Sequence, residues 1–252
     1  MKNKMKEKLS RGEVVIGSFM YIPSSKLTEI VGWLGFDFVV IDQEHGPVDT
    51  SQAEDMVRAA EHAGATPIIR VSHNTPHLIL RAFDIGAHAI HVPEINTKEE
   101  AELAAKSARY GPVGQRGLGG VRAAKYGLAG PLSEYAPQAN EENLVIAHIE
   151  HYRAVDNLDE LLAVDGIDIY YLGPEDLSNS LGIPGQSKDP RVVELVESSI
   201  QRIAAAGKVA GCIAADPATA RRYCELGALY IASHAIKFMS QASREFLKEV
   251  RA

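Results

Sequence analysis

The chain has 252 residues, 46% of them hydrophobic, which is enough apolar material for the core of one large barrel-type domain. A formal net charge of −7, with both signs mixed along the chain, argues against nucleic acid or an anionic membrane as the main partner and favours a small-molecule ligand. Two cysteines without metal-type spacing, and no apolar run behind the charged first residues, predict a cytoplasmic protein without a secretory signal or membrane span.

Short apolar segments alternate with helical patterns along the whole chain. The expected strands are Val14–Phe19, Phe36–Asp42, Pro67–Val71, Ala89–Val92, Leu144–Ile149, Ile167–Leu172, Val209–Ile213 and Leu229–Ser233. Helical patterns end in a glycine, which adopts the left-handed cap conformation without steric cost, at Gly35, Gly64, Gly86, Gly166, Gly207 and Gly227. Eight such βα units predict a closed (β/α)8 TIM barrel, forming a single domain over residues 1–252, rather than an open doubly wound sheet.

Local signals mark where several helices begin. Capping-box spacing occurs at Ser51 with Glu54 and at Thr97 with Glu100, and an Asp-Pro pair opens a helix at residues 189–190 and 216–217.

One connection, Arg109–Asn140, breaks this rhythm. It is rich in glycine and has neither a helical nor a strand period. A long irregular connection in a compact domain is usually functional or disordered. Its basic residues Arg116, Arg122 and Lys125 fit an anion-contacting lid or a subunit contact, and a plain surface loop fits equally well.

Polar side chains follow the expected strands at their carboxyl ends. The second strand ends in Asp42, with Glu44 and His45 directly after it, and the third ends near Arg70. A TIM barrel carries its chemistry at this end of its strands, although Asp42 and His45 could also simply cap a turn. A guanidinium at the end of a buried strand needs an anionic partner, and an organic carboxylate or an enolate is a plausible one.

Two carboxylates follow the fifth and sixth strands. Glu150 and Asp176 could share a divalent cation such as Mg²⁺ or Mn²⁺ through their oxygens, with water in the remaining positions. The alternatives are a solvated strand end for Glu150 and a helix cap for Asp176. If Pro174 opens a short helix after Gly173, the free amides of its first turn favour a bound carboxylate.

Together these segments resemble the HpcH/HpaI family of class II, metal-dependent pyruvate aldolases, typified by 4-hydroxy-2-oxoheptanedioate aldolase. The resemblance covers nearly the whole chain, and its most specific motifs are 41–45 (IDQEH), 69–71 (IRV), 116–119 (RGLG), 149–150 (IE) and 173–178 (GPEDLS). It implies a TIM barrel that binds Mg²⁺, Mn²⁺ or Co²⁺. It also implies a homo-oligomer, commonly a hexamer or trimer of dimers, with the C-terminal helix exchanged between subunits.

The resemblance also implies roles for individual residues. Glu150 and Asp176 correspond to the metal ligands, Arg70 to the residue on the pyruvyl oxygen, and His45 to the acid–base group. The substrate-binding set is Arg70, His148, Gly173, Pro174 and Glu175.

Three further positions carry less definite expectations. Asp84 either orients His45 or is an ordinary helix-end residue, and Asp42 is expected to lie behind the site and support it. The family usually carries Gln where this chain has His148. Residues two apart on a strand face the same side, so His148 should point into the barrel beside Glu150. There it could take over a polar contact, add a metal ligand or mark a changed substrate.

The expected reaction is the reversible cleavage of a 4-hydroxy-2-oxo acid to pyruvate and an aldehyde, through a pyruvate enolate that the divalent metal stabilises. A histidine suits removal of the proton from the C4 hydroxyl, since imidazole titrates near neutral pH. Oxaloacetate decarboxylation or a biosynthetic carbon–carbon condensation on the same scaffold is the first alternative. A non-catalytic barrel that binds a metabolite anion is the second, and His148 in place of Gln is the feature that favours it.

Overall fold

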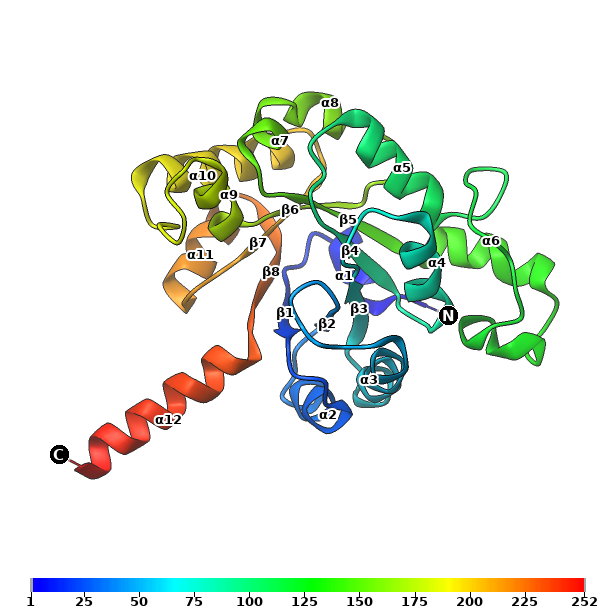
Figure 1. Ribbon diagram of the computed structural model, residues 1–252, viewed down its shortest axis with the longest axis horizontal. Helices are drawn as coiled ribbons and strands as arrows, with labels where there is room; N and C mark the ends of the chain where they lie inside the picture. The colour runs from blue at the N-terminus through cyan, green and yellow to red at the C-terminus, as the bar shows by residue number, and fades with distance from the viewer. Residues whose placement is uncertain (1, 252) are drawn as a thin grey trace.

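The computed structural model describes residues 2–251, and its eight strands form a closed parallel barrel in the order β1 to β8 (Figure 1). The strands are β1 (Val15–Met20), β2 (Phe38–Asp42), β3 (Thr66–Arg70), β4 (Ala89–Val92), β5 (Leu144–Ile149), β6 (Ile169–Leu172), β7 (Val209–Ile213) and β8 (Ala228–His234). The (β/α)8 prediction is confirmed. The predicted bounds of the fourth, fifth and seventh strands match, because largely apolar runs of this length form strands buried on both faces.

Helices connect the strands on the outside of the barrel. They are α1 (Lys4–Ser10), α2 (Ser25–Trp33), α3 (Thr50–Ala63), α4 (Pro76–Asp84), α5 (Lys98–Ala108), α6 (Leu132–Glu142), α7 (Tyr152–Asp156), α8 (Leu158–Leu162), α9 (Pro174–Ser180), α10 (Pro190–Ala205), α11 (Pro217–Glu225) and α12 (Ala235–Arg251). All six predicted cap glycines have positive φ.

Most of the predicted helix starts are correct. The capping box of Thr97 and Glu100 is present, and α10 and α11 begin at the prolines after Asp189 and Asp216. The box predicted at Ser51 is wrong, because Asp49 and Gln52 form it two residues earlier. An Asp-x-x-Gln sequence satisfies the same two backbone amides.

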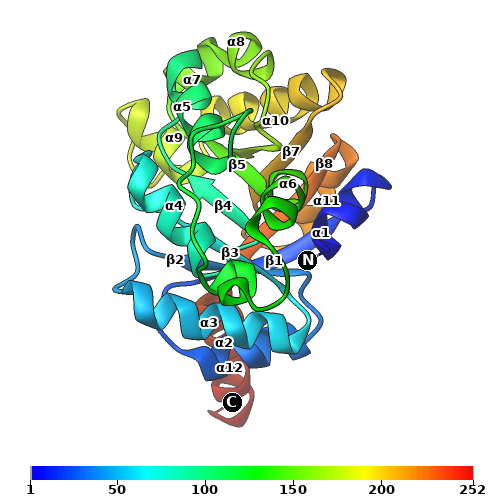
Figure 2. The same ribbon diagram turned by 90° about the vertical axis from the view of Figure 1, so that its right-hand side faces the viewer.

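The prediction of an irregular connection over residues 109–140 is wrong for its second half. That half contains the 3₁₀ segment η1 (Arg122–Gly127) and the helix α6. Figure 2 shows α6 beside α1, and the Asn3 side chain donates to the Glu142 carbonyl oxygen at 3.0 Å. The helix α6 is polar and contains Pro137, so the hydrophobic pattern of the sequence does not indicate a helix there.

The inside of the barrel is filled by large rings that pack against glycines. The rings of Phe38 and Tyr230 stack with centroids 4.2 Å apart. A Cβ on Gly17 would lie 2.2 Å from the Phe38 ring, and one on Gly211 would lie 2.9 Å from the Tyr230 ring. These glycines therefore make room for aromatic side chains that neighbouring strands contribute.

The helix α12 extends away from the barrel (Figure 1), and Ala235 is its one residue that is buried among the described residues. None of the helices in residues 2–251 combines the length and the apolar character that a membrane span requires.

Candidate active site at the carboxyl ends of the barrel strands

A pocket opens at the carboxyl ends of the strands and collects most of the side chains that the sequence indicated. It is lined by Phe19, Tyr21, His45, Arg70, His148, Glu150, Tyr171, Gly173, Pro174, Glu175, Asp176, Ile213 and His234. Asp42 and Asp84 are the two predicted site residues that are not among these lining residues.

Arg70, the last residue of β3, is held by carboxylates of the adjoining β2 segment. Its Nε donates to Asp42 Oδ1 at 2.8 Å, its Nη2 also binds Asp42, and Nη1 lies 2.9 Å from Glu44 Oε2. Asp42 is fully buried. Burial disfavours the charge of Arg70, but the hydrogen bonds and charges of these carboxylates outweigh it and raise the pKa of the guanidinium. The site therefore contains a fixed positive charge.

Two aromatic residues of the β1 segment form the wall beside this charge. The guanidinium carbon of Arg70 lies 5.0 Å from the centre of the Phe19 ring, a cation–π contact. Tyr21 stacks on His234 with ring centroids 5.0 Å apart, and burial raises the pKa of Tyr21 to about 12. Tyr21 is therefore a neutral hydroxyl group in this wall.

Glu150 follows β5 and is buried, with one hydrogen-bond donor on each carboxylate oxygen. Oε1 accepts the backbone N–H of Glu94 at 2.8 Å, and Oε2 lies 2.8 Å from His148 Nδ1. Glu94 has φ 56°, a left-handed conformation that costs free energy in a residue other than glycine. Burial opposes ionisation of Glu150, but the neighbouring His148 and the Glu94 amide outweigh it and lower the pKa of the carboxyl group.

Asp176 lies in the first turn of α9, and Pro174 opens this helix as predicted. A Cβ on Gly173 would lie 3.2 Å from Glu150 Oε2 and 3.8 Å from Asp176 Oδ2, so the two carboxylates border one small space. Burial and then the charge of Glu150 raise the pKa of Asp176. Two carboxylates that repel each other in this way form a donor set that suits a hard divalent cation.

The fit to a metal ion is limited to this pair. Within residues 2–251, no group of three or more His, Cys, Asp or Glu side chains is arranged to hold a metal ion. Glu150 and Asp176 would therefore leave most coordination positions to water and substrate, as Mg²⁺ commonly requires.

In this structure His45 and Asp84 have different partners. His45 lies on the rim of the pocket, exposed, and its backbone N–H donates to Asp42 Oδ1 at 3.3 Å. Asp84 ends α4 and forms an ion pair of 2.8 Å with Arg116, whose side chain is fully buried. Within this chain Asp84 is thus bound to Arg116.

Several pocket residues were not singled out from the sequence. Phe19 and Tyr171 belong to apolar strand runs, whose pattern assigns them to the core, and Tyr21 and His234 follow the predicted first and eighth strands. His91 lies behind the pocket, where its ring is fully buried inside the barrel and its Nδ1 lies 2.6 Å from His148 Nε2. The alternation of β4 places His91 inside the barrel, but its partners come from β5 and β8, and sequence does not indicate such contacts.

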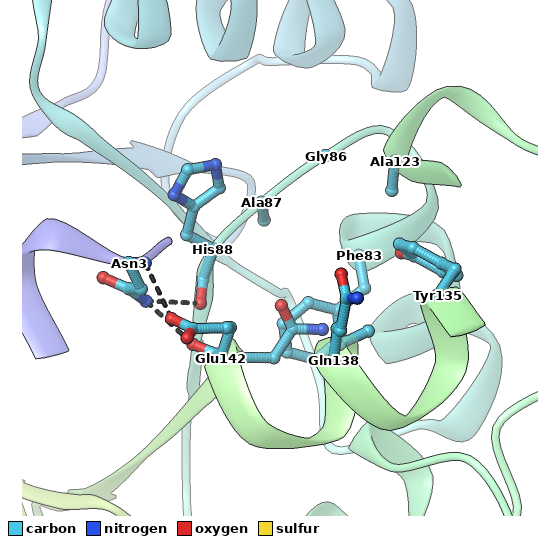
Figure 3. Close-up of a pocket in the computed structure, with 11 residues that line it drawn as sticks. Asn3, Phe83, Gly86, Ala87, His88, Ala123, Tyr135, Gln138 and Glu142 are labelled. Atoms are coloured by element: carbon cyan, nitrogen blue, oxygen red, sulfur yellow. Dashed lines mark hydrogen bonds between the residues drawn. The ribbon is translucent and has the colours of Figure 1, made fainter. Parts of the chain in front are cut away.

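A second cavity lies at the opposite end of the barrel, next to α6 (Figure 3). Its polar groups bind one another, since the Asn3 amide donates to the backbone oxygens of His88 and Glu142.

Comparison with known proteins agrees with this arrangement. The model of the HpcH/HpaI aldolase/citrate lyase family matches residues 16–236. A 2-keto-3-deoxy-L-rhamnonate aldolase of Salmonella gallinarum is 38% identical over 234 residues, covering 92% of this chain and 86% of that protein. An HpcH/HpaI aldolase/citrate lyase family protein from Burkholderia cenocepacia has 33% identity and a TM-score of 0.94 over 100% of both chains. The citrate synthase SbnG has 31% identity and a TM-score of 0.86, covering 98% of this chain and 97% of that one.

Proposed function

The chain belongs to the HpcH/HpaI aldolase/citrate lyase family, and from this premise we propose a divalent-metal-dependent aldolase that reversibly cleaves a 4-hydroxy-2-oxo acid to pyruvate and an aldehyde. The protein is a carbon–carbon lyase. The observation that carries the proposal is the pairing of Glu150 and Asp176 around Gly173 in the same pocket as the fixed charge of Arg70. By analogy with its relatives, a 2-keto-3-deoxy sugar acid such as 2-keto-3-deoxy-L-rhamnonate is the proposed substrate class.

Glu150 and Asp176 are the proposed ligands of the cation, which is Mg²⁺, Mn²⁺ or Co²⁺. Bound there, the ion supplies Lewis-acid polarisation of the substrate's keto group. Arg70 adds a positive charge that the protein has already fixed in position, so no reorganisation is needed when negative charge develops on the keto oxygen. The free first-turn amides after Gly173 and Pro174 are proposed to bind the substrate carboxylate, with Glu175 and His148 completing the wall.

His45 is the proposed acid–base group. It lies on the rim of the pocket, where the hydroxyl-bearing part of the substrate would enter. Removing the proton from the C4 hydroxyl starts cleavage of the C3–C4 bond, and returning it completes the reverse condensation. Asp84 could orient His45 only from another copy of the chain or after a rearrangement, because here it is bound to Arg116.

The assembly proposed for the protein is a homo-oligomer, a hexamer or trimer of dimers, built with α12. The apolar side chains of this helix are exposed in the single chain, among them Phe246 (67%) and Val250 (68%). Both cysteines are free thiols, which agrees with a proposed location in the reducing cytoplasm.

A second candidate is condensation of an oxo-acid enolate with another carbonyl compound, or decarboxylation of oxaloacetate, at the same site. The similarity to the citrate synthase SbnG favours it. Both reactions pass through the same kind of enolate, so the pocket alone fits either.

The decisive experiment measures pyruvate release from 2-keto-3-deoxy-L-rhamnonate, and from oxaloacetate, by metal-free protein with and without added Mg²⁺, Mn²⁺ or Co²⁺. We expect release from the sugar acid to require the ion and to be abolished by Glu150→Ala, while the variant keeps its melting temperature. Full turnover in excess chelator would contradict the metal mechanism. Turnover of oxaloacetate alone would favour the second candidate.

A further inference from the structure

A continuous chain of hydrogen bonds crosses the inside of the barrel and ends on Glu150. Tyr230 Oη lies 2.7 Å from His91 Nε2, His91 Nδ1 lies 2.6 Å from His148 Nε2, and His148 Nδ1 lies 2.8 Å from Glu150 Oε2. Tyr230 and His91 have no exposed surface, and His148 is 1% exposed. Each link joins side chains of different strands except the last, where the two residues are neighbours on one side of the β5 segment.

For an ionised Glu150 and neutral His148 and His91, only one direction of every bond is possible. An ionised Glu150 can only accept, so His148 Nδ1 carries a proton. A neutral His148 then accepts at Nε2, which requires the proton of His91 on Nδ1. His91 Nε2 is left as an acceptor, and the hydroxyl of Tyr230 donates to it. All these polar groups are satisfied with both imidazoles neutral, and burial lowers the pKa of His91 well below its usual value.

We propose that Tyr230, His91 and His148 are positioning residues, a one-way hydrogen-bond chain that aims the Nδ1–H of His148 at Glu150 and fixes this carboxylate for cation binding. The inference rests on the proposed function, because it concerns the same metal-binding carboxylate. With the Glu94 amide on Oε1 and His148 on Oε2, each oxygen keeps a lone pair for the ion while the carboxylate plane cannot rotate.

The barrel is shaped to accommodate this chain. Gly211 on β7 makes room for two rings at once, since a Cβ there would lie 2.9 Å from the Tyr230 ring and 3.2 Å from that of Tyr171. Tyr171 in turn packs against His91 and His148, with both ring centroids 4.9 Å away. The two imidazoles are thus held by ring packing as well as by hydrogen bonds.

The direction of the chain has a spectroscopic signature. Both His91 and His148 should carry their single proton on Nδ1, and ¹⁵N chemical shifts of the ring nitrogens distinguish this tautomer from the Nε2–H form. The opposite tautomer at His91, or a doubly protonated His148, would overturn the assigned direction, because His148 Nε2 would then not accept from His91.

The functional test measures Mn²⁺ affinity of the resting, substrate-free protein by calorimetry. His148→Leu should weaken binding about 10- to 100-fold, the usual effect of losing the group that orients a metal ligand. His148→Gln should stay within about threefold of the unchanged protein, because a carboxamide has both the donor for Glu150 and the acceptor for His91. In the hydrogen-bond chain His91 and His148 lie between Tyr230 and Glu150. Tyr230→Phe should weaken Mn²⁺ binding roughly fivefold, the effect of about one hydrogen bond.

A matched control and a double variant separate positioning from a general loss of stability. Tyr170→Phe removes another buried tyrosine hydroxyl, which donates to the Leu161 carbonyl outside the barrel, and should lower the melting temperature without changing Mn²⁺ affinity. Tyr230→Phe added to His148→Leu should weaken binding no further, since the chain is already cut. If the unchanged protein binds Mn²⁺ and His148→Leu and Tyr230→Phe bind it with the same affinity, the role of the hydrogen-bond chain is contradicted but the proposed function is not. Absence of Mn²⁺ binding by the unchanged protein would overturn the proposed function and the chain with it.

Discussion

Arg70 is the residue whose surroundings most clearly distinguish an enolate site from a simple anion pocket. Arg70 is 5% exposed and its guanidinium is bound to Asp42, so its orientation is fixed before any substrate arrives. A donor fixed in this way binds more strongly as charge develops in the transition state. Asp42 and Glu44 supply that orientation and do not themselves line the pocket.

Replacing Arg70 by Ala should therefore lower both kcat and kcat/KM by about 10²- to 10³-fold, the typical effect of losing one oxyanion donor. Steady-state kinetics, and exchange of the pyruvate methyl protons with deuterated water, measure the effect. Arg70→Lys should restore little, because an ammonium group cannot reproduce the planar contacts.

The variant also leaves Asp42 buried without its partner, at a cost of about 3–5 kcal/mol, so the assays belong well below its melting temperature. Arg109→Ala is the matched control. It removes an arginine that pairs with Asp168 at the other end of the barrel, and should affect stability but not kcat. A rise in KM alone, with kcat and proton exchange intact, would mean that Arg70 binds the far end of the substrate.

At the scale of elements, the sequence predicted the strands better than the connections between them. The Leu144–Ile149 run is apolar except for His148 and is bounded by polar residues, and its bounds match the structure. The helix α6 was missed because its composition is polar and contains Pro137, while its helicity depends on packing against α1 and η1. The local sequence pattern of α6 does not indicate this tertiary contact.

The same contrast holds for the candidate site. Arg70, Glu150 and Asp176 were indicated because charged residues at or shortly after the carboxyl ends of apolar strands are conspicuous in the sequence. His91 and Tyr230 were missed because a polar atom inside an apolar run becomes meaningful only when partners from β4, β5 and β8 meet across the barrel. The sequence thus indicated the charged residues that line the pocket, but neither its aromatic wall nor the hydrogen-bond chain behind Glu150.

The junction between β6 and α9 carries a prediction of its own. Gly173 has φ −106°, which any residue adopts, so Ala is excluded there only by space. Its Cβ would lie 3.1 Å from Glu150 Cβ and 3.2 Å from Oε2. We expect Gly173→Ala to displace Glu150 and lower kcat/KM by roughly 10- to 100-fold, as small misplacements of a catalytic group do, with little change in melting temperature.

Gly120→Ala is the control for this prediction. Its Cβ would meet nothing closer than 3.7 Å, in an exposed segment, so neither activity nor stability should change. Unchanged activity in Gly173→Ala would show that the position of Glu150 tolerates the added methyl group.

At the scale of the whole molecule, the two ends of the chain behave differently. The helix α1 packs beneath the barrel, where Met5 is 1% exposed and belongs to the interior core. The helix α12 instead contacts the barrel near its own first turns, where the rings of Phe238 and Phe36 lie 5.5 Å apart. The rest of its apolar face is exposed, together with Trp33 (62%) and Leu34 (71%) near the end of α2. Apolar surface of this extent marks an interaction site.

A second copy of the chain is the partner we propose for α12, so disrupting its apolar face should dissociate the oligomer. Phe246→Glu places a charge where the partner would bury a ring, and light scattering after size-exclusion chromatography should show a lower mass than for the unchanged protein. The melting temperature of the barrel should change little, because Phe246 is 67% exposed in the single chain. Gln241→Glu adds the same charge about 140° around the helix and should leave the assembly intact. An unchanged protein that is monomeric at working concentrations would contradict the proposed assembly.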